Sequence, residues 1–324
     1  MTRVFRDRAI FCIVAIILAA LGTQDSLAQS RANSVTPAVS GSSARPVIIP
    51  LTIRVKGEIA PSEMELQTVD LTVNEDGEPQ TILSIRAMGT NAPINLMVLV
   101  QDDVVSSVRL ETKGMAEFIR RLPRGSRVSV GYLRTGALQV KQRFTSDLDK
   151  AAASLRGPTG IATTAPYNPY VEVIEAVKRF DAQPAGRRAV LLISDGLDIS
   201  HGAESSSPGQ SIDLERAITE AQRRSVAIYS FYAPAALTTS SMTLIGNAQG
   251  SLEKLSHETG GRAFFQGLSA PTSFEPFLKE LSASLDRQIA LTYLSTHLDE
   301  GFHRVKITSS TPGVEVNYPS GYKR

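Results

Sequence analysis

Three short segments rich in carboxylate and hydroxyl groups carry the side chains of this sequence that could do chemistry. The first is 101–107 (Gln-Asp-Asp-Val-Val-Ser-Ser), and it follows the apolar run 95–100. The second contains Thr163 and Thr164, and the third is 194–198 (Ser-Asp-Gly-Leu-Asp), after the apolar run 189–193. An open parallel sheet binds ligands beyond the carboxyl ends of its strands, where these segments would meet. Their oxygen atoms could accept hydrogen bonds from a ligand.

Most other chemistries have no recognisable motif in the sequence. The single cysteine, Cys12, excludes a disulfide scaffold and a cysteine-ligated zinc site. The four histidines lack i, i+4 pairing and metalloprotease spacing, so we expect them at the surface: His201, His257, His297 and His303. There is no Gly-x-Ser-x-Gly elbow, phosphate-binding loop or dinucleotide fingerprint. We therefore expect no enzyme, and a hydrolase is the less favoured alternative because no nucleophile–base pair can be identified.

Strands and helices alternate along residues 93–287 and would position the three segments. Continuous apolar runs at 95–100 and 189–193 predict strands buried on both faces of a sheet. Apolar residues recur at helical spacing around 108–122, 171–177, 214–221 and 274–285, and Thr135-Gly136 separates two alternating runs. The pattern predicts an α/β fold with a doubly wound, mostly parallel sheet.

Short β-rich segments flank this domain at 47–90 and 288–324. Apolar and polar residues alternate from Leu51 to Val55 and from Val69 to Val73, and 75–78 (Glu-Asp-Gly-Glu) is a turn signal. We expect the two segments to pair into one β-domain into which the α/β domain is inserted. The alternative is two independent hairpins packed on the α/β core.

The first 28 residues have the order of a secretory signal peptide. Three arginines precede an apolar run of 13 residues at 9–21, and Ser26-Leu27-Ala28 supplies small residues at a cleavage site. A membrane anchor is the alternative, but a span needs about 20 apolar residues. We expect cleavage after Ala28, a flexible linker at 29–46, and a mature chain without a membrane span. The chain is expected outside the cytoplasm, in the periplasm, at the cell surface or in the medium.

The charge balance excludes one class of partner. The sequence has 34 Lys and Arg against 32 Asp and Glu, a formal net charge of +2, and its basic residues are spread along the chain. Nucleic-acid-binding proteins concentrate basic residues on one face. We therefore expect no nucleic-acid partner.

The three segments resemble the metal-ion-dependent adhesion site of von Willebrand factor type A domains. That site has Asp-x-Ser-x-Ser after the first strand, a Thr in a later loop, and the Asp of an Asp-Gly pair after the fourth strand. Asp195 matches the Asp-Gly pair, and Thr164 matches the loop Thr, with Thr163 in reserve.

A closer resemblance is to the secreted bacterial VWFA-related acidobacterial domain family. It covers nearly the whole mature chain and is carried by six stretches. They are 71–85 (Leu-Thr-Val-Asn-Glu-Asp-Gly-Glu-Pro-Gln-Thr-Ile-Leu-Ser-Ile), 144–147 (Phe-Thr-Ser-Asp), 258–261 (Glu-Thr-Gly-Gly), 302–307 (Phe-His-Arg-Val-Lys-Ile), 312–316 (Pro-Gly-Val-Glu-Val) and 321–322 (Gly-Tyr). The resemblance implies a von Willebrand A-like fold and a role in protein binding.

The resemblance also implies a bound Mg²⁺, with Mn²⁺ or Ca²⁺ as substitutes, and an open coordination position that a partner's Glu or Asp fills. The metal residues carried over are Asp102, Asp103, Ser106, Thr164 and Asp195. The first motif departs from the family. A start at Asp102 or at Asp103 puts a valine where a ligand serine belongs, so at least one ligand is lost.

The expected function is a secreted protein-interaction or adhesion module that binds a protein partner at this rim, through a degenerate metal site. The alternative is a structural or assembly protein of the cell envelope without a working metal site. In that case Asp102, Asp195 and the hydroxyl residues cap helices and satisfy loop backbone groups.

Overall fold

The computed structural model describes residues 44–55, 70–164, 168–184 and 186–324. The signal peptide predicted at 1–28 and nearly all of the linker predicted at 29–46 lie outside this part. Arg45 and Pro46, the last linker residues, belong to strand β1. Within the described ranges, no helix is long and apolar enough to cross a membrane.

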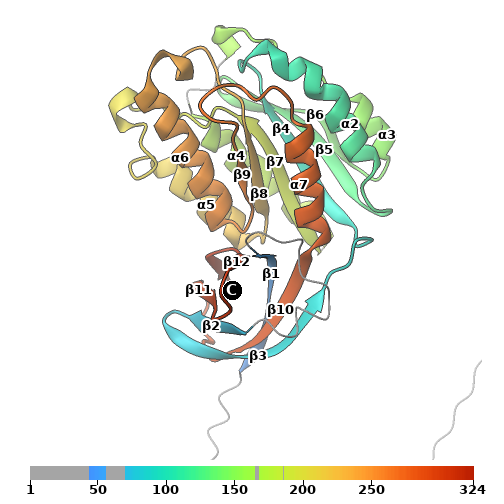
Figure 1. The fold of residues 1–324 in the computed structure, drawn as a ribbon, viewed down its shortest axis with the longest axis vertical. Helices are drawn as coiled ribbons and strands as arrows, with labels where there is room; N and C mark the ends of the chain where they lie inside the picture. The colour runs from blue at the N-terminus through green and yellow to red at the C-terminus, as the bar shows by residue number, and fades with distance from the viewer. Residues whose placement is uncertain (1–43, 56–69, 165–167, 185) are drawn as a thin grey trace, which may run out of the picture. The chain divides into compact units, whose positions relative to one another are not determined.

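A six-stranded sheet forms the centre of the α/β domain, in the order β6-β5-β4-β7-β8-β9 (Figure 1). Its strands are β4 (Ile94–Gln101), β5 (Arg127–Arg134), β6 (Ala137–Thr145), β7 (Arg187–Ser194), β8 (Ala227–Tyr232) and β9 (Ala263–Phe264). All neighbours pair in parallel except β5 and β6, which form the hairpin around Gly136 at one edge. The prediction of a doubly wound, mostly parallel sheet is confirmed.

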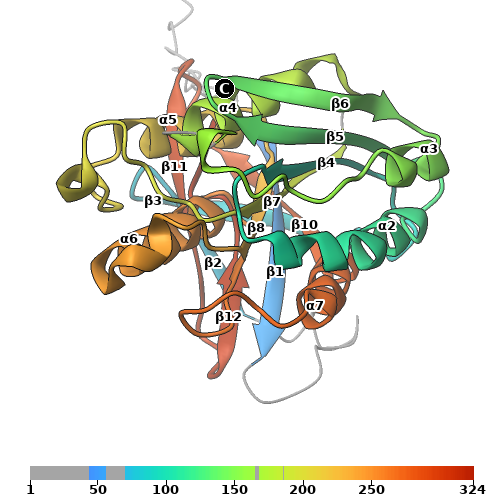
Figure 2. The same cartoon turned by 90° about the horizontal axis from the view of Figure 1, so that it is seen from above.

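Helices cover both faces of this sheet. On one face α2 (Thr112–Arg120) packs against α3 (Leu148–Ala153) and α7 (Glu275–Asp286). On the other, α5 (Ile212–Arg223) lies between α4 (Pro169–Lys178) and α6 (Met242–Glu258) (Figure 2). Side chains alternate along β4, so Leu96, Val98 and Val100 enter the first core, and Met97 and Leu99 the second. This explains the continuous apolar run.

Strands from both flanking segments form a second, antiparallel sheet in the order β12-β1-β10-β3-β2-β11-β13. The N-terminal segment supplies β1 (Arg45–Val55), β2 (Leu71–Glu75) and β3 (Glu78–Ala87). The C-terminal segment supplies β10 (Gln288–Ser295), β11 (Phe302–Ser309), β12 (Val314–Asn317) and β13 (Gly321–Lys323). β1 pairs with β10 and β12, and β2 pairs with β11. The alternating apolar residues predicted at 51–53 and 71–73 lie in its buried core, with Leu291 and Tyr293.

Arg187 ties the amino end of β7 to the start of β10. Its guanidinium group donates to Gln288 Oε1 at 2.9 Å, to the carbonyl of Ala92 at 2.9 Å and to that of Leu285 at 2.5 Å. Burial lowers the pKa of this arginine. The second sheet therefore joins the α/β domain at the amino ends of its parallel strands, and the carboxyl ends form a separate rim.

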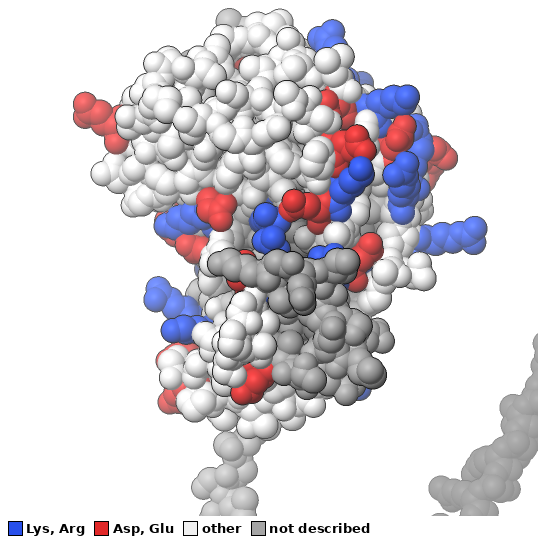
Figure 3. Space-filling view, in the orientation of Figure 1, with Lys and Arg blue, Asp and Glu red and all other residues white. Residues whose placement is uncertain are grey.

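Charged side chains of both signs mingle on the α2–α7 side of the domain (Figure 3). Ion pairs join Arg120 to Asp149, Arg121 to Glu117 and Lys279 to Glu275. On the face seen in Figure 3 this mixture gives no patch of a single sign, unlike the basic surfaces that bind phosphate backbones.

Candidate functional site at the carboxyl rim of the parallel sheet

Gln101, the last residue of β4, joins two of the three predicted segments. In the parallel register Val100 lies opposite Ile193, so the ends of β4 and β7 are side by side. Gln101 Oε1 accepts hydrogen bonds from Ser194 Oγ at 2.5 Å and from the backbone N–H of Asp195 at 3.2 Å. Its Nε2 donates to Asp103 Oδ1 at 2.9 Å. The segments therefore meet through an amide side chain that the sequence analysis did not assign to the site.

Asp102 is completely buried, and arginines from two other elements bind its carboxylate. Arg156 Nη1 lies 2.6 Å from Oδ1, and Nη2 lies 3.1 Å from Oδ2. Arg134, at the end of β5, places Nε 3.1 Å from Oδ2. The backbone N–H of Thr159 donates to Oδ1 at 3.1 Å. Four contacts thus use both oxygens of this carboxylate.

Tyr132 of β5 holds Arg156 in place. The Arg156 guanidinium carbon lies 3.8 Å above the centre of the Tyr132 ring, a cation–π geometry. The Tyr132 hydroxyl accepts a hydrogen bond from the backbone N–H of Arg156 at 2.6 Å. The hydrogen bond to Asp102 raises the pKa of Arg156, outweighing the effect of burial, so this arginine stays charged. Sequence analysis missed Arg134 and Arg156. The sequence gives one indication: Arg134 directly precedes the predicted Thr135-Gly136 turn, so it lies at the end of a strand.

Asp195 is buried, and its carboxylate serves the turn that follows β7. Its Oδ1 accepts from the backbone N–H of Leu197 at 3.1 Å, and its Oδ2 accepts a hydrogen bond from the Thr238 hydroxyl. Burial raises the pKa of Asp195 to about 6. Thr238 begins the short 3-10 helix η5 (Thr238–Ser240), in the polar loop after β8.

The remaining predicted residues have local partners. Thr164 Oγ1 donates to the carbonyl of Ile161 at 2.7 Å and lies 3.3 Å from Thr159 Oγ1. Ser106 is exposed at the first position of the 3-10 helix η1 (Ser106–Glu111). Burial raises the pKa of Asp103, which outweighs its hydrogen bond from Gln101. The side chain of Thr163 lies outside the described part.

These residues do not fit an octahedral magnesium site. Val104, in a position where the family has a ligand hydroxyl, is fully buried and forms a bridge with Ala235. Two guanidinium groups already neutralise Asp102, so a divalent cation beside this carboxylate would be repelled. In the described ranges, Asp102, Asp103 and Asp195 do not form a group of three carboxylate ligand atoms within 4.8 Å of one another.

No protein-family model matches the sequence, and no curated protein is similar enough to match it. Solved structures of similar fold do match. One is an aerotolerance-related membrane protein from Bacteroides fragilis, with 11% identity, a TM-score of 0.41, and coverage of 59% of this chain and 98% of that chain.

Two further solved structures match as well. BatB from Bacteroides thetaiotaomicron has 12% identity and a TM-score of 0.38, over 59% of this chain and 97% of that chain. A von Willebrand factor type A protein from Catenulispora acidiphila has 13% identity and a TM-score of 0.40, over 86% of this chain and 73% of that chain. At these identities the likeness is one of fold.

Proposed function

We propose that this chain is an exported, non-enzymatic protein-interaction module that binds an acidic side chain of a partner protein through Arg134 and Arg156, without a metal ion. Export is inferred from the signal peptide expected at residues 1–28. The observation that carries the proposal is that two arginines pair with one buried carboxylate, that of Asp102.

The charges around Asp102 do not cancel. Two guanidinium groups face one carboxylate, which leaves one positive charge in this group of three residues. The side chains of Arg134 and Arg156 are 33% and 36% exposed, whereas that of Asp102 is 0% exposed. Guanidinium groups bind carboxylates in fixed planar geometry, and those of Arg134 and Arg156 are held by buried anchors. A second carboxylate could therefore bind from the solvent side.

The location supports the same role. The family resemblance places a cation at this rim, where a partner's Glu or Asp completes its coordination. A fixed arginine pair supplies positive charge at the same rim without a metal. The carboxylate of Asp195 is held by Thr238 and Leu197, so the proposal assigns it a structural role and no catalytic step.

Binding of a peptide panel tests the proposal. Peptides with one Glu or Asp in varied apolar contexts, and matched Gln or Asn versions, are titrated against the purified chain by fluorescence polarisation. We expect acidic peptides to bind equally with EDTA or Mg²⁺ and more weakly at high salt. Arg134→Gln should weaken their binding at least tenfold.

Arg121→Gln is the matched control, because Arg121 is 81% exposed on the surface beyond the end of α2. It should leave binding unchanged. Arg156→Lys keeps the charge but loses the two-point contact, and should give an intermediate loss. Binding that needs Mg²⁺ and Asp195 would contradict the proposal, as would equal affinity for the acidic and amide peptides.

A further inference from the structure

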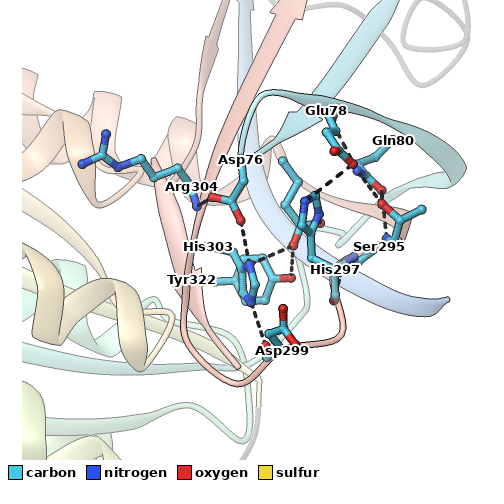
Figure 4. Close-up of polar contacts among 11 residues, drawn as sticks. Asp76, Glu78, Gln80, Ser295, His297, Asp299, His303, Arg304 and Tyr322 are labelled. Carbon is cyan, nitrogen blue, oxygen red and sulfur yellow. Dashed lines mark hydrogen bonds and ion pairs between the residues drawn. The ribbon is translucent and has the colours of Figure 1, made fainter. Parts of the chain in front are cut away.

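A second cluster of titratable side chains lies in the antiparallel sheet (Figure 4). Glu75 ends β2, Asp76 begins the turn to β3, and His297 follows β10 by two residues. One ligand atom from each of these three residues lies within 4.8 Å of the other two. The cluster therefore joins the N-terminal and C-terminal segments of the chain.

Two buried atoms in this cluster face each other without a hydrogen bond. Glu75 is 0% exposed, and its Oε1 accepts from the Tyr322 hydroxyl at 2.7 Å. Among the described residues no hydrogen-bond partner reaches Glu75 Oε2 or His297 Nδ1, and these two atoms are 4.0 Å apart. Buried polar atoms are nearly always satisfied, because leaving one unpaired costs about 1–3 kcal/mol. A cation between them would satisfy both.

The ring of His297 lies between two glutamates. Its Nδ1 is 4.0 Å from Glu75 Oε2, and its Nε2 is 3.7 Å from Glu78 Oε2, which is too long for a hydrogen bond. Ser295 Oγ accepts from the backbone N–H of His297 at 3.2 Å and donates to its carbonyl at 3.1 Å. A ligating histidine usually donates its other ring N–H to a carboxylate, and Glu78 would have to move closer to His297 to accept it.

His303 positions Asp76. Its Nδ1 is 2.8 Å from Asp76 Oδ2, and its Nε2 is 3.0 Å from the carbonyl of Asp299. Both ring nitrogens already contact oxygen atoms, so His303 is not among the proposed metal ligands. Asp76 Oδ1 also accepts from the backbone N–H of Arg304 at 2.8 Å, while the Arg304 side chain extends away from the cluster (Figure 4).

We propose that Glu75, Asp76 and His297 bind one divalent transition-metal ion, with zinc as the best match to one imidazole and two carboxylates. Zinc bonds to nitrogen and oxygen are about 2.0 to 2.2 Å long, so two ligand atoms of a tetrahedral ion lie about 3.3 to 3.6 Å apart. The 4.0 Å between Glu75 Oε2 and His297 Nδ1 would therefore shorten by about 0.5 Å when the ion binds. Water would complete the coordination on the solvent side, where the side chain of Asp76 is 34% exposed. The ion would cross-link β2 to the segment after β10.

Zinc titration of the purified chain by calorimetry tests this site, with Co²⁺ absorption as a second readout of coordination geometry. We expect one Zn²⁺ per chain and a rise in melting temperature, because an ion that binds only the folded state stabilises it. His297→Gln and Asp76→Asn should each lower the affinity at least tenfold. Asparagine is chosen because Asp76 has a positive φ of 49°, which asparagine tolerates.

His257→Gln, on α6, is the control and should bind zinc as the unaltered chain does. The circular dichroism spectrum of each variant without metal should match that of the unaltered chain. If one of the two site variants fails to fold, the other still tests the proposed zinc site. The proposal is overturned if there is no saturable binding at tenfold excess of Zn²⁺, or if both folded site variants bind it unchanged. The peptide experiment is independent, because Arg134 and Arg156 take no part here.

Discussion

Arg156 binds both oxygens of the buried Asp102 carboxylate, with Nη1 at 2.6 Å from Oδ1 and Nη2 at 3.1 Å from Oδ2. This contact connects the loop after α3 to the end of β4, and Arg134 adds a second positive charge. A carboxylate with no exposed surface needs a compensating charge. In this chain guanidinium groups supply it, at the rim where the family resemblance implies a cation.

Removing Arg156 should destabilise the fold. Arg156→Ala takes away both contacts to Oδ1 and Oδ2 and leaves Asp102 with Arg134 as its one ionic partner. Losing one side of a buried ion pair costs several kcal/mol, and since Arg156 is partly exposed we expect about 2 kcal/mol in the free energy of unfolding. Urea denaturation measures the change.

Arg121→Ala is the control for this experiment, because it removes an exposed ion pair to Glu117 whose loss should cost less than about 1 kcal/mol. Equal losses in the two variants would mean that the pairing with Asp102 contributes no more than a surface contact.

Magnesium should not bind at the rim in a manner that depends on Asp195. Calorimetry with Mg²⁺ up to millimolar concentration should give the same result for the unaltered chain and for Asp195→Ala, because Asp102 is already neutralised and Val104 offers no oxygen. Because the two chains differ only at Asp195, any metal ion bound at Glu75, Asp76 and His297 contributes equally to both titrations. Saturable binding that the substitution abolishes would restore the magnesium site expected from the sequence.

Glu172 should make stability fall as pH rises. This residue of α4 is 3% exposed, its Oε2 has no hydrogen-bond partner among the described residues, and burial raises its pKa from the ordinary 4.5 to about 8. Between these values the folded chain keeps the proton that the unfolded chain releases, so the free energy of unfolding decreases with rising pH.

Glu172→Gln should remove this decrease and stabilise the chain by roughly 2 to 4 kcal/mol at pH 8.5, relative to its effect at pH 4. Chemical denaturation across the pH series measures it, and Glu253→Gln, an exposed position on α6, is the control. A parallel pH dependence of Glu172→Gln and the unaltered chain would show that Glu172 is not the cause.

Gly196 should not tolerate alanine. Its φ is +73°, and a Cβ atom there would lie 2.5 Å from Leu252 Cγ and 2.8 Å from the Ala248 carbonyl oxygen. Gly202 has a φ of +90° with nothing within 4 Å, so Gly202→Ala carries backbone strain alone. We expect a loss of about 1 kcal/mol for Gly202→Ala and at least 3 kcal/mol for Gly196→Ala, measured by thermal and urea unfolding. Equal losses of stability in the two variants would show that α6, which carries Ala248 and Leu252, moves to accommodate the added methyl group.

The sequence by itself determined the elements whose patterns are local. The side chains of Val98 and Leu99 point to opposite faces of β4, into two different cores. A strand that is buried on both faces must be apolar at nearly every position, which is why each of the two long apolar runs forms a buried parallel strand. The helix expected across 108–122 is split into η1 and α2, and β9, with two residues, is too short to show any period. The rim segments at 101–107 and 194–198 also followed from strand polarity, because each begins at the last residue of a parallel strand.

Tertiary structure decided the chemistry of both sites. Whether the carboxylate of Asp102 faces a metal or an arginine depends on a side chain 54 residues away, and no periodicity encodes that contact. His297 gave no motif because its partners, Glu75 and Asp76, come from the opposite flank of the chain. The pairing of β1 with β10 and of β2 with β11 brings the flanks together. Local sequence patterns set which face a residue occupies, whereas charge pairing and ligand geometry depend on contacts that form only when distant segments pack.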